Sequence, residues 1–327
     1  MRQTSATQSP GRRRGKKSSR RGRWPRAPLF ATAVCICAAV GATPASAATF
    51  SNSSAIAIAI SGAATPYPSN ITVSGLGSSI MDVNATLSGF NHSLPADVDV
   101  LLVSPTGQNV MLMSDVPRDR GPLFACEANV TGLNLTFDDS AGPIPPGSPL
   151  VAGTYQPTNN EIAVTGCGDP SDALSAPAPA GPYGSALAPL NSGNPNGVWS
   201  LYVFDDSLAD SGSVANGWNL EIKPSNTFTL GAITRNKKKG TATVTVTVPN
   251  SGELTGSVNG AKVASARAVT SKSVGAGQAQ LLVNAKGKKK RKLNETGKVK
   301  LKIAITYTPT GGDPNSQSVK VTLKKKL

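Results

Sequence analysis

The sequence contains a single histidine, His92, and only four cysteines among 327 residues. A zinc site needs about four Cys, His or carboxylate ligands, and a Ser-His-Asp triad needs a histidine as its base. The chain also lacks a Gly-x-Ser-x-Gly motif in a strand–helix context, a zinc signature and a paired Cys and His. These absences predict a non-catalytic protein, in which His92 has a structural role.

After residue 47 the sequence lacks any apolar run long enough to cross a bilayer. Before it, a basic region precedes the short apolar run "APLFATAVCICAAVGA" and the small-residue pattern "ASA" at 45–47. This order is typical of a secretory signal, and an uncleaved anchor is the alternative. We expect cleavage near Ala47 and a secreted, extracellular or envelope-associated protein.

Cysteine is scarce in the predicted mature chain, where only Cys126 and Cys167 remain. An exported protein enters an oxidising compartment, so an even pair predicts a disulfide. That bond would close a loop of about 42 residues and stabilise the fold by roughly 4 kcal/mol in the loop-entropy treatment. A two-cysteine zinc site is the alternative, but it lacks further ligands.

Acidic residues are almost absent from both ends of the chain. Residues 1–47 carry a formal charge of +10, residues 48–223 carry −12 and residues 224–327 carry +17. The net charge of +15 therefore describes no single surface. The distribution predicts an acidic body joined to a basic C-terminal region.

Helical periodicity is also nearly absent. Between residues 48 and 223, short apolar and β-branched runs recur between Gly, Pro and Asn clusters, which predicts an all-β sandwich. Met81, Val83, Ala85 and Leu87 alternate with polar residues, as in a strand with one buried face. "VDVLLVSP" is continuously apolar, as in a strand covered on both faces. Residues 142–192 are rich in Pro, Ala, Gly and Asn and predict a long ordered loop or an insertion.

Alternating strands return after Pro224 in "TATVTVTVPN", "AQLLVNAKG", "VKLKIAITYTP" and "QSVKVTLKKK". Phe228 and Tyr307 are the aromatic residues of this region, so its core must rest on aliphatic side chains. The pattern predicts a small, basic, Ig-like β-sandwich over residues 224–327. By composition and strand pattern the region resembles lysine-rich C-terminal β-domains of exported bacterial proteins.

Two blocks of residues 48–223 carry a family resemblance. The first is "GFNHSLPADVDVLLVSPTGQNVMLMSD", with His92, then Asp97 or Asp99, and a Ser-Pro-x-Gly ending. The second is "NPNGVWSLYVFDDSLADSGSVANGWNLEI". In this order they resemble the P domain (Homo B domain) of subtilisin-like proprotein convertases, in a free-standing bacterial secreted form. The family's catalytic domain does not precede the match here, and the Pro-rich stretch and cysteine pair are not part of the convertase pattern.

The resemblance implies a jelly-roll, galactose-binding-like sandwich in which His92 fixes a loop by a hydrogen bond. Trp199 and Trp218 lie on alternating strands and are expected to anchor the core. The implied function is a binding or stabilising module at the cell surface or outside the cell, contacting a protein or glycan. The alternative is a non-catalytic accessory module of a subtilisin-like serine endopeptidase made as a separate chain.

Acidic pairs suggest a cation site. Neighbouring residues on a strand point to opposite faces, so adjacent carboxylates are poorly arranged for shared acid–base chemistry. Calcium prefers several oxygen ligands in a turn of small residues, and bacterial members of the resembled family bind it. The predicted ligands are Asp205, Asp206, Asp210, Asp138 and Asp139. The alternative is a set of solvated turns whose carboxylates accept from backbone N–H groups.

The basic runs "RNKKKG" (235–240) and "KGKKKRK" (286–292) lack interleaved aromatic residues that could stack on bases. For an exported protein we therefore expect no specific nucleic-acid partner, and expect anionic envelope polymers or lipid headgroups instead. The alternative is that these lysines only keep the sheet soluble and its edges unpaired.

Overall fold

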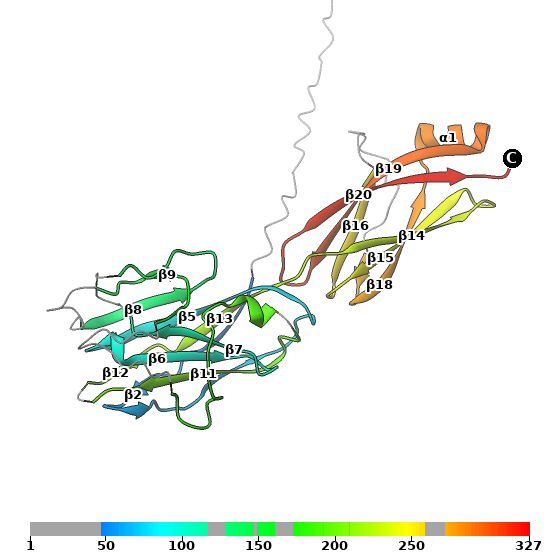
Figure 1. Cartoon of the computed structure of the whole chain (residues 1–327). Helices are drawn as coiled ribbons and strands as arrows, with labels where there is room; N and C mark the ends of the chain where they lie inside the picture. Colours follow the sequence, from blue (N-terminus) through cyan, green and yellow to red (C-terminus); the bar gives the residue numbers. More distant parts are fainter. Residues whose placement is uncertain are drawn as a thin grey trace, which may run out of the picture. The chain divides into compact units, whose positions relative to one another are not determined.

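The structure is a computed structural model that describes residues 47–116, 129–146, 149–160, 173–191, 193–208, 210–258 and 272–327. Residues 1–46 of the predicted leader lie outside the described residues, as do Cys126 and Cys167 of the predicted disulfide. Almost all of the regular structure is β-strand, and the strands form packed sheets (Figure 1). This confirms the predicted all-β sandwich class.

The N-terminal sandwich consists of two sheets. The first contains β1 (Ala48–Asn52), β2 (Ile56–Ile58), β5 (Ile80–His92), β8 (Val130–Phe137), β9 (Gly153–Tyr155), β12 (Gly212–Val214) and β13 (Trp218–Pro224). Its neighbour order is β1-β13-β5-β12-β2, with β8 also paired to β5 and β9 paired to β8. The second contains β3 (Gly62–Ala63), β4 (Ser69–Val73), β6 (Val98–Val103), β7 (Asn109–Ser114), β10 (Thr158–Asn159) and β11 (Gly197–Asp205). Its order is β10-β7-β6-β11-β3, with β4 also paired to β11.

One hydrophobic core fills the space between these two sheets, because alternate side chains of each strand point inward. Trp199 and Trp218 are both fully buried in it. Each indole N–H has a partner: Trp199 donates to the carbonyl of Pro195 at 2.9 Å, and Trp218 donates to Ser69 Oγ at 3.0 Å. The two side chains therefore combine a large buried surface with a satisfied polar group.

The outer face of the second sheet is also covered. Leu101, Met111 and Tyr202 form a smaller buried cluster there with Tyr183, which belongs to the Pro-rich stretch. Two hydrogen bonds hold that stretch in place. The hydroxyl of Tyr67 donates to the carbonyl of Ser175, and the hydroxyl of Tyr202 donates to the carbonyl of Pro177. This cover explains why β6 is buried on both faces, as its continuously apolar sequence predicts.

The alternation of buried and exposed residues predicted for β5 is wrong at one position. Val83, Ala85 and Leu87 are buried as predicted, but Met81 is 41% exposed and Ile80 takes the inward place. A register irregularity between Lys223 and Pro224 of β13 pairs Pro224 with Ile80. An inserted residue shifts the side-chain alternation by one position, and a sequence pattern alone does not reveal it.

The C-terminal sandwich has a separate core of aliphatic side chains around Phe228 and Tyr307. One sheet consists of β14 (Thr229–Asn236), β15 (Thr241–Val248) and β18 (Gly277–Asn284), in that order. The other consists of β16 (Gly252–Val258), β17 (Lys272–Val274), β19 (Lys298–Pro309) and β20 (Asn315–Lys324), in the order β17-β16-β19-β20. The two core clusters fall on either side of the predicted division between residues 223 and 224.

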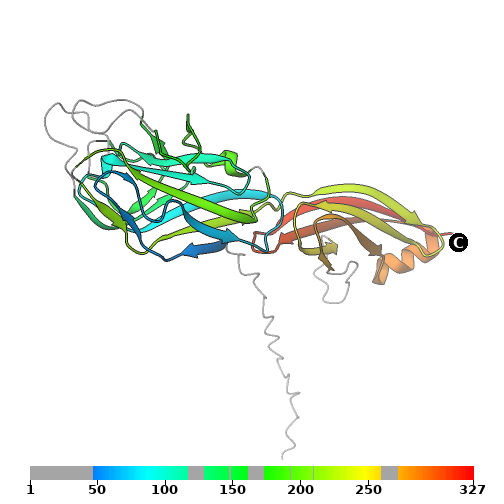
Figure 2. The same cartoon turned by 90° about the horizontal axis from the view of Figure 1, so that it is seen from below.

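The basic run 286–292 is not a simple turn, because it forms most of helix α1 (Gly287–Thr296). Lys, Arg, Leu and Glu favour helix, and Leu293 buries one position of the helix against the core. Gly297 ends the helix in the left-handed conformation at φ 67°, where its N–H donates to the carbonyl of Leu293. Figure 2 shows α1 at the end of this sandwich near the C-terminus.

The hydroxyl of Tyr307 fixes a turn at the edge of this core. It donates to the carbonyl of Asn250 at 2.6 Å and accepts from the Asn250 N–H at 3.2 Å, and burial raises the pKa of Tyr307 to about 12. Replacing Tyr307 by Phe leaves both buried backbone groups without this partner, so we expect the sandwich to lose about 1–3 kcal/mol of stability.

Chemical unfolding followed by far-ultraviolet circular dichroism measures this loss. Tryptophan fluorescence is the internal control, because the described tryptophans, Trp199 and Trp218, both lie in the N-terminal sandwich. An unchanged dichroism transition in the Phe variant would contradict the prediction.

Candidate functional site

An acidic group lies at one end of the N-terminal sandwich, where β11 finishes. Asp205 is completely buried, and its Oδ2 accepts a hydrogen bond from Nε2 of His92 at 3.0 Å. Its Oδ1 accepts from the N–H of Ser207 at 3.2 Å. The two halves of the family-like pattern therefore meet here, because His92 ends β5 and Asp205 ends β11.

Both ring nitrogens of His92 are engaged. Nε2 contacts Asp205, and Nδ1 lies 2.8 Å from the carbonyl oxygen of Leu94 and 3.1 Å from its amide nitrogen. The side chain has no exposed surface. A general base must reach the proton that it removes from a substrate. This geometry gives His92 the position of a loop anchor, held between a strand and the chain that follows it.

The pattern-based ligand set omitted Asp97, which belongs to the same group. Asp97 ends the short 3-10 helix η1 (Pro95–Asp97), and its carbonyl accepts from the N–H of Asp206 at 3.0 Å. Its side chain is buried, and its Oδ2 has no hydrogen-bond partner among the described residues. The spacing of an acid five residues after the histidine was visible in the sequence, but its burial was not.

Burial raises the pKa of the Asp97 carboxyl to about 6. The neighbouring carboxylates of Asp205 and Asp210 also raise it, whereas a hydrogen bond with Ser207 and the proximity of His92 lower it. The charged form is disfavoured because little water reaches the carboxyl and negative groups surround it.

The predicted calcium ligands are divided between two places. Asp205, Asp206 and Asp210 lie at the acidic end, whereas Asp138 and Asp139 follow β8. Asp138 Oδ1 accepts from the N–H of Ser140 at 2.7 Å. The two oxygens of Asp139 accept from the N–H groups at 187 and 188, each at 2.8 Å, next to the short 3-10 helix η2 (Ala188–Asn191).

In these contacts the carboxylates of Asp138 and Asp139 accept hydrogen bonds from backbone N–H groups of loops and so fix the loop conformation. Within the described ranges, no three His, Cys, Asp or Glu side chains are grouped so that they could hold a metal ion. Oδ2 of Asp97 is a buried carboxylate oxygen without a hydrogen-bond partner among the described residues. Calcium binding stays a prediction.

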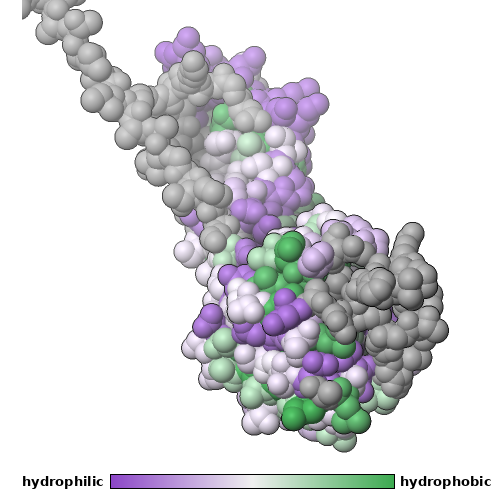
Figure 3. Space-filling view, turned by 90° about the vertical axis from the view of Figure 1, so that its left-hand side faces the viewer, coloured by the Kyte–Doolittle hydropathy of each residue, from purple (hydrophilic) through white to green (hydrophobic). Residues whose placement is uncertain are grey.

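Two large apolar side chains are exposed beside the acidic end. Ile60 precedes β3 and Leu208 follows β11, and the pairing of Gly62 with Asp205 brings these two loops together. Ile60 is 60% exposed and Leu208 is 77% exposed. Figure 3, which looks at the left side of Figure 1, shows hydrophobic patches among hydrophilic surface.

A lysine stripe lies on the outer face of the four-stranded sheet of the C-terminal sandwich. It consists of Lys298, Lys300, Lys302, Lys320 and Lys324, all exposed. Lys298 lies directly opposite Lys324, and Lys302 lies directly opposite Lys320. None of these five lysines forms an ion pair with a carboxylate of the described residues. The stripe therefore concentrates positive charge without local compensation, a feature that the basic runs in the sequence did not reveal.

The comparisons with known proteins add little. No family model matches the chain, and no curated protein matches it. A solved structure, the glycoside hydrolase domain of Endo-D from Streptococcus pneumoniae R6, aligns over 81% of this chain and 32% of its own, at 8% identity and a TM-score of 0.17. The chain thus spans about a third of that structure, and a TM-score this low does not indicate a shared fold. No helix of the described residues is long and apolar enough to span a membrane.

Proposed function

We propose that this chain is a secreted, non-catalytic binding protein, held at the cell envelope by its C-terminal sandwich. The ligand is an anionic envelope polymer, which contacts the lysine stripe along β19 and β20. The observation that carries the proposal is the two pairs of directly opposed lysines, Lys298 with Lys324 and Lys302 with Lys320.

Opposed lysines do not help the fold by themselves. Like charges directly opposite each other on neighbouring strands destabilise a sheet. Lysines on an edge strand can prevent unwanted pairing, and this accounts for those on β20. The described pairing of β16 with β19 covers Ile303–Pro309, so edge protection can also apply to Lys298, Lys300 and Lys302, but it does not require lysines directly opposite one another on both strands. A polyanion along the stripe neutralises these charges and releases its own counterions.

The test is retention on isolated envelopes during a salt gradient. Substituting Lys298, Lys302, Lys320 and Lys324 by Gln is expected to weaken retention about tenfold or more at moderate salt, since each lysine near an anionic surface contributes about 1 kcal/mol. The matched control is Lys288, Lys289, Arg291 and Lys292 changed to Gln, which removes the same charge from α1.

Equal losses in the two variants would show that only net charge matters and would contradict a role for the stripe. Retention of the stripe variant at the level of the unsubstituted protein would contradict the proposal altogether. Circular dichroism checks that both variants are folded.

The N-terminal sandwich supplies the binding surface for a further partner in this proposal. Ile60 and Leu208 are exposed on two loops that the pairing of Gly62 with Asp205 joins, and exposed apolar side chains support a protein partner more than a glycan. The second candidate function, an accessory module of a secreted subtilisin-like endopeptidase, would use the same loops. Exchanging both residues for Ser should leave envelope retention unchanged.

A further inference from the structure

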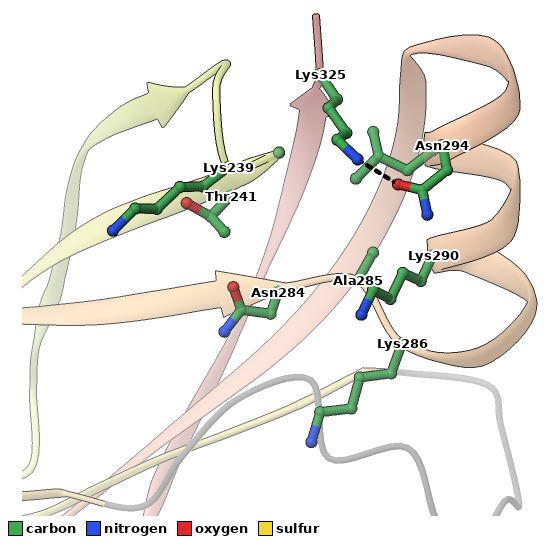
Figure 4. A pocket seen from close by; sticks show the side chains of 10 residues that line it. Lys239, Thr241, Asn284, Ala285, Lys286, Lys290, Asn294 and Lys325 are labelled. Atoms are coloured by element: carbon green, nitrogen blue, oxygen red, sulfur yellow. Dashed lines mark hydrogen bonds between the residues drawn. The ribbon is translucent and has the colours of Figure 1, made fainter. Parts of the chain in front are cut away.

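A cavity of about 340 Å³ lies at one end of the C-terminal sandwich (Figure 4). Four segments meet there: the turn between β14 and β15, the link from the end of β18 to α1, helix α1 itself, and the residues after β20. Each segment contributes a lysine, namely Lys239, Lys286, Lys290 and Lys325. These residues are up to 86 positions apart in the chain, so the tertiary structure alone assembles the group.

The lining combines these lysines with three buried small or apolar residues, Gly240, Ala285 and Leu293. Thr241 and Asn284 add neutral polar groups. No carboxylate is among the described residues that line it. Figure 4 shows Lys286 and Lys290 extending in the same direction and Lys325 pointing to Asn294, whose Oδ1 accepts from Lys325 Nζ at 2.8 Å.

The start of α1 adds a second sign that an anion belongs here. The partial positive charge of a helix N-terminus favours acidic residues in the first turn and disfavours basic ones. The first turn of α1 has no acidic residue, its N-cap Lys286 makes no side-chain cap, and Lys290 follows one turn later. The cavity and the helix start are each electrostatically unfavourable alone, and one bound anion stabilises both.

The shape narrows the ligand class. A cavity of this volume admits a phosphate group with one attached polyol or sugar unit, whereas a folded protein is far too large. Lysine ammonium groups bind phosphate oxygens as strong charge-assisted donors, and a hydroxyl and an amide can complete the contacts. The buried side chains of Ala285 and Leu293 suit contact with the carbon skeleton of the attached unit.

We propose that this pocket binds a single phosphate group of a phosphate-bearing envelope polymer. The inference rests on the proposed envelope retention and gives it a discrete recognition site next to the lysine stripe. Lys298 begins β19 and Lys324 ends β20, immediately beside Gly297 and Lys325, so a bound polymer could continue from the pocket onto the stripe.

The test is an NMR titration of the intact secreted chain with glycerol 1-phosphate, with inorganic phosphate and acetate as parallel ligands. We expect saturable shifts centred on Thr241, Asn284 and α1 with glycerol phosphate, and weaker or unsaturable shifts with acetate. Lys286→Gln with Lys290→Gln should raise the dissociation constant about thirtyfold, the effect of losing roughly 1 kcal/mol for each of two contacts. Lys288→Gln with Lys289→Gln, which removes equal charge from the same helix outside the pocket, should change it less than about threefold.

Equal weakening in both double variants, or shifts that never saturate, would overturn the pocket. The stripe variant separates this result from that of the proposed function. If the stripe variant binds glycerol phosphate and is also retained normally on envelopes, the role of the stripe in retention is contradicted and the pocket stands. If it elutes early while no variant binds glycerol phosphate, the pocket fails and the retention role stands. Binding to phosphatidylglycerol vesicles in preference to soluble glycerol phosphate would assign the site to a lipid headgroup. It would contradict the proposal that the ligand is an envelope polymer.

Discussion

Replacing His92 with alanine is expected to lower the free energy of unfolding of the N-terminal sandwich by about 3–5 kcal/mol. Among the described residues, the substitution leaves the completely buried carboxylate of Asp205 with one hydrogen bond, from the N–H of Ser207. A buried charge without its partner loses hydration that nothing replaces. Replacing His92 also removes the hydrogen bond that links the end of β5 to the end of β11.

Denaturant unfolding followed by tryptophan fluorescence measures this effect, because Trp199 and Trp218 both lie in this core. The matched control is the double variant His92→Ala with Asp205→Ala, which removes both partners. We expect it to lose less than the sum of the single variants, since no unpaired charge remains. A loss below about 1 kcal/mol for His92→Ala would contradict the structural role assigned to the histidine.

Asp97 is expected to make the stability of the same sandwich fall as the pH rises. The pKa of Asp97 is about 6 in the folded protein, compared with an ordinary value of 3.8 for an aspartate in water. Between these values the folded state binds more protons than the unfolded state, so the slope of stability against pH is negative. Its contribution is fully present below pH 3.8 and is lost as the pH passes through about 6. The total change from this group is about 1–3 kcal/mol.

Asp97→Asn removes the titrating group and should abolish this component of the pH profile. We therefore expect the variant to gain stability relative to the parent protein between pH 4 and pH 7.5, as measured by urea unfolding across that range. Asp210→Asn is the comparison, because it removes a neighbouring charge and leaves Asp97 able to titrate. Profiles for the parent and Asp97→Asn that run parallel would contradict the prediction.

The same variants address calcium. If a calcium ion binds at the acidic end, added Ca²⁺ should raise the stability of the parent protein at neutral pH, and Asp97→Asn or Asp205→Ala should abolish the increase. Asp138→Ala should not affect it, because Asp138 lies with Asp139 in a different group of contacts.

Local pattern was sufficient for the strands and insufficient for the places where they meet. Alternation of apolar and polar residues predicted β13 and β15, since a period of two has one structural meaning. It misplaced Met81, because a register irregularity depends on the partner strand. It also missed α1, where a run of lysines carries no apolar period and one buried leucine orients the helix.

The sequence by itself determined the all-β class, the aliphatic character of the C-terminal core and the segregation of acidic from basic residues, because each depends on composition and on neighbours a few positions away. Only the tertiary structure decided that His92 meets Asp205, that Asp97 is buried beside them, that lysines of β19 face lysines of β20, and that four distant lysines line one cavity. Those arrangements depend on strand register and loop closure. These follow from the packing of whole sheets, which no short stretch of sequence encodes.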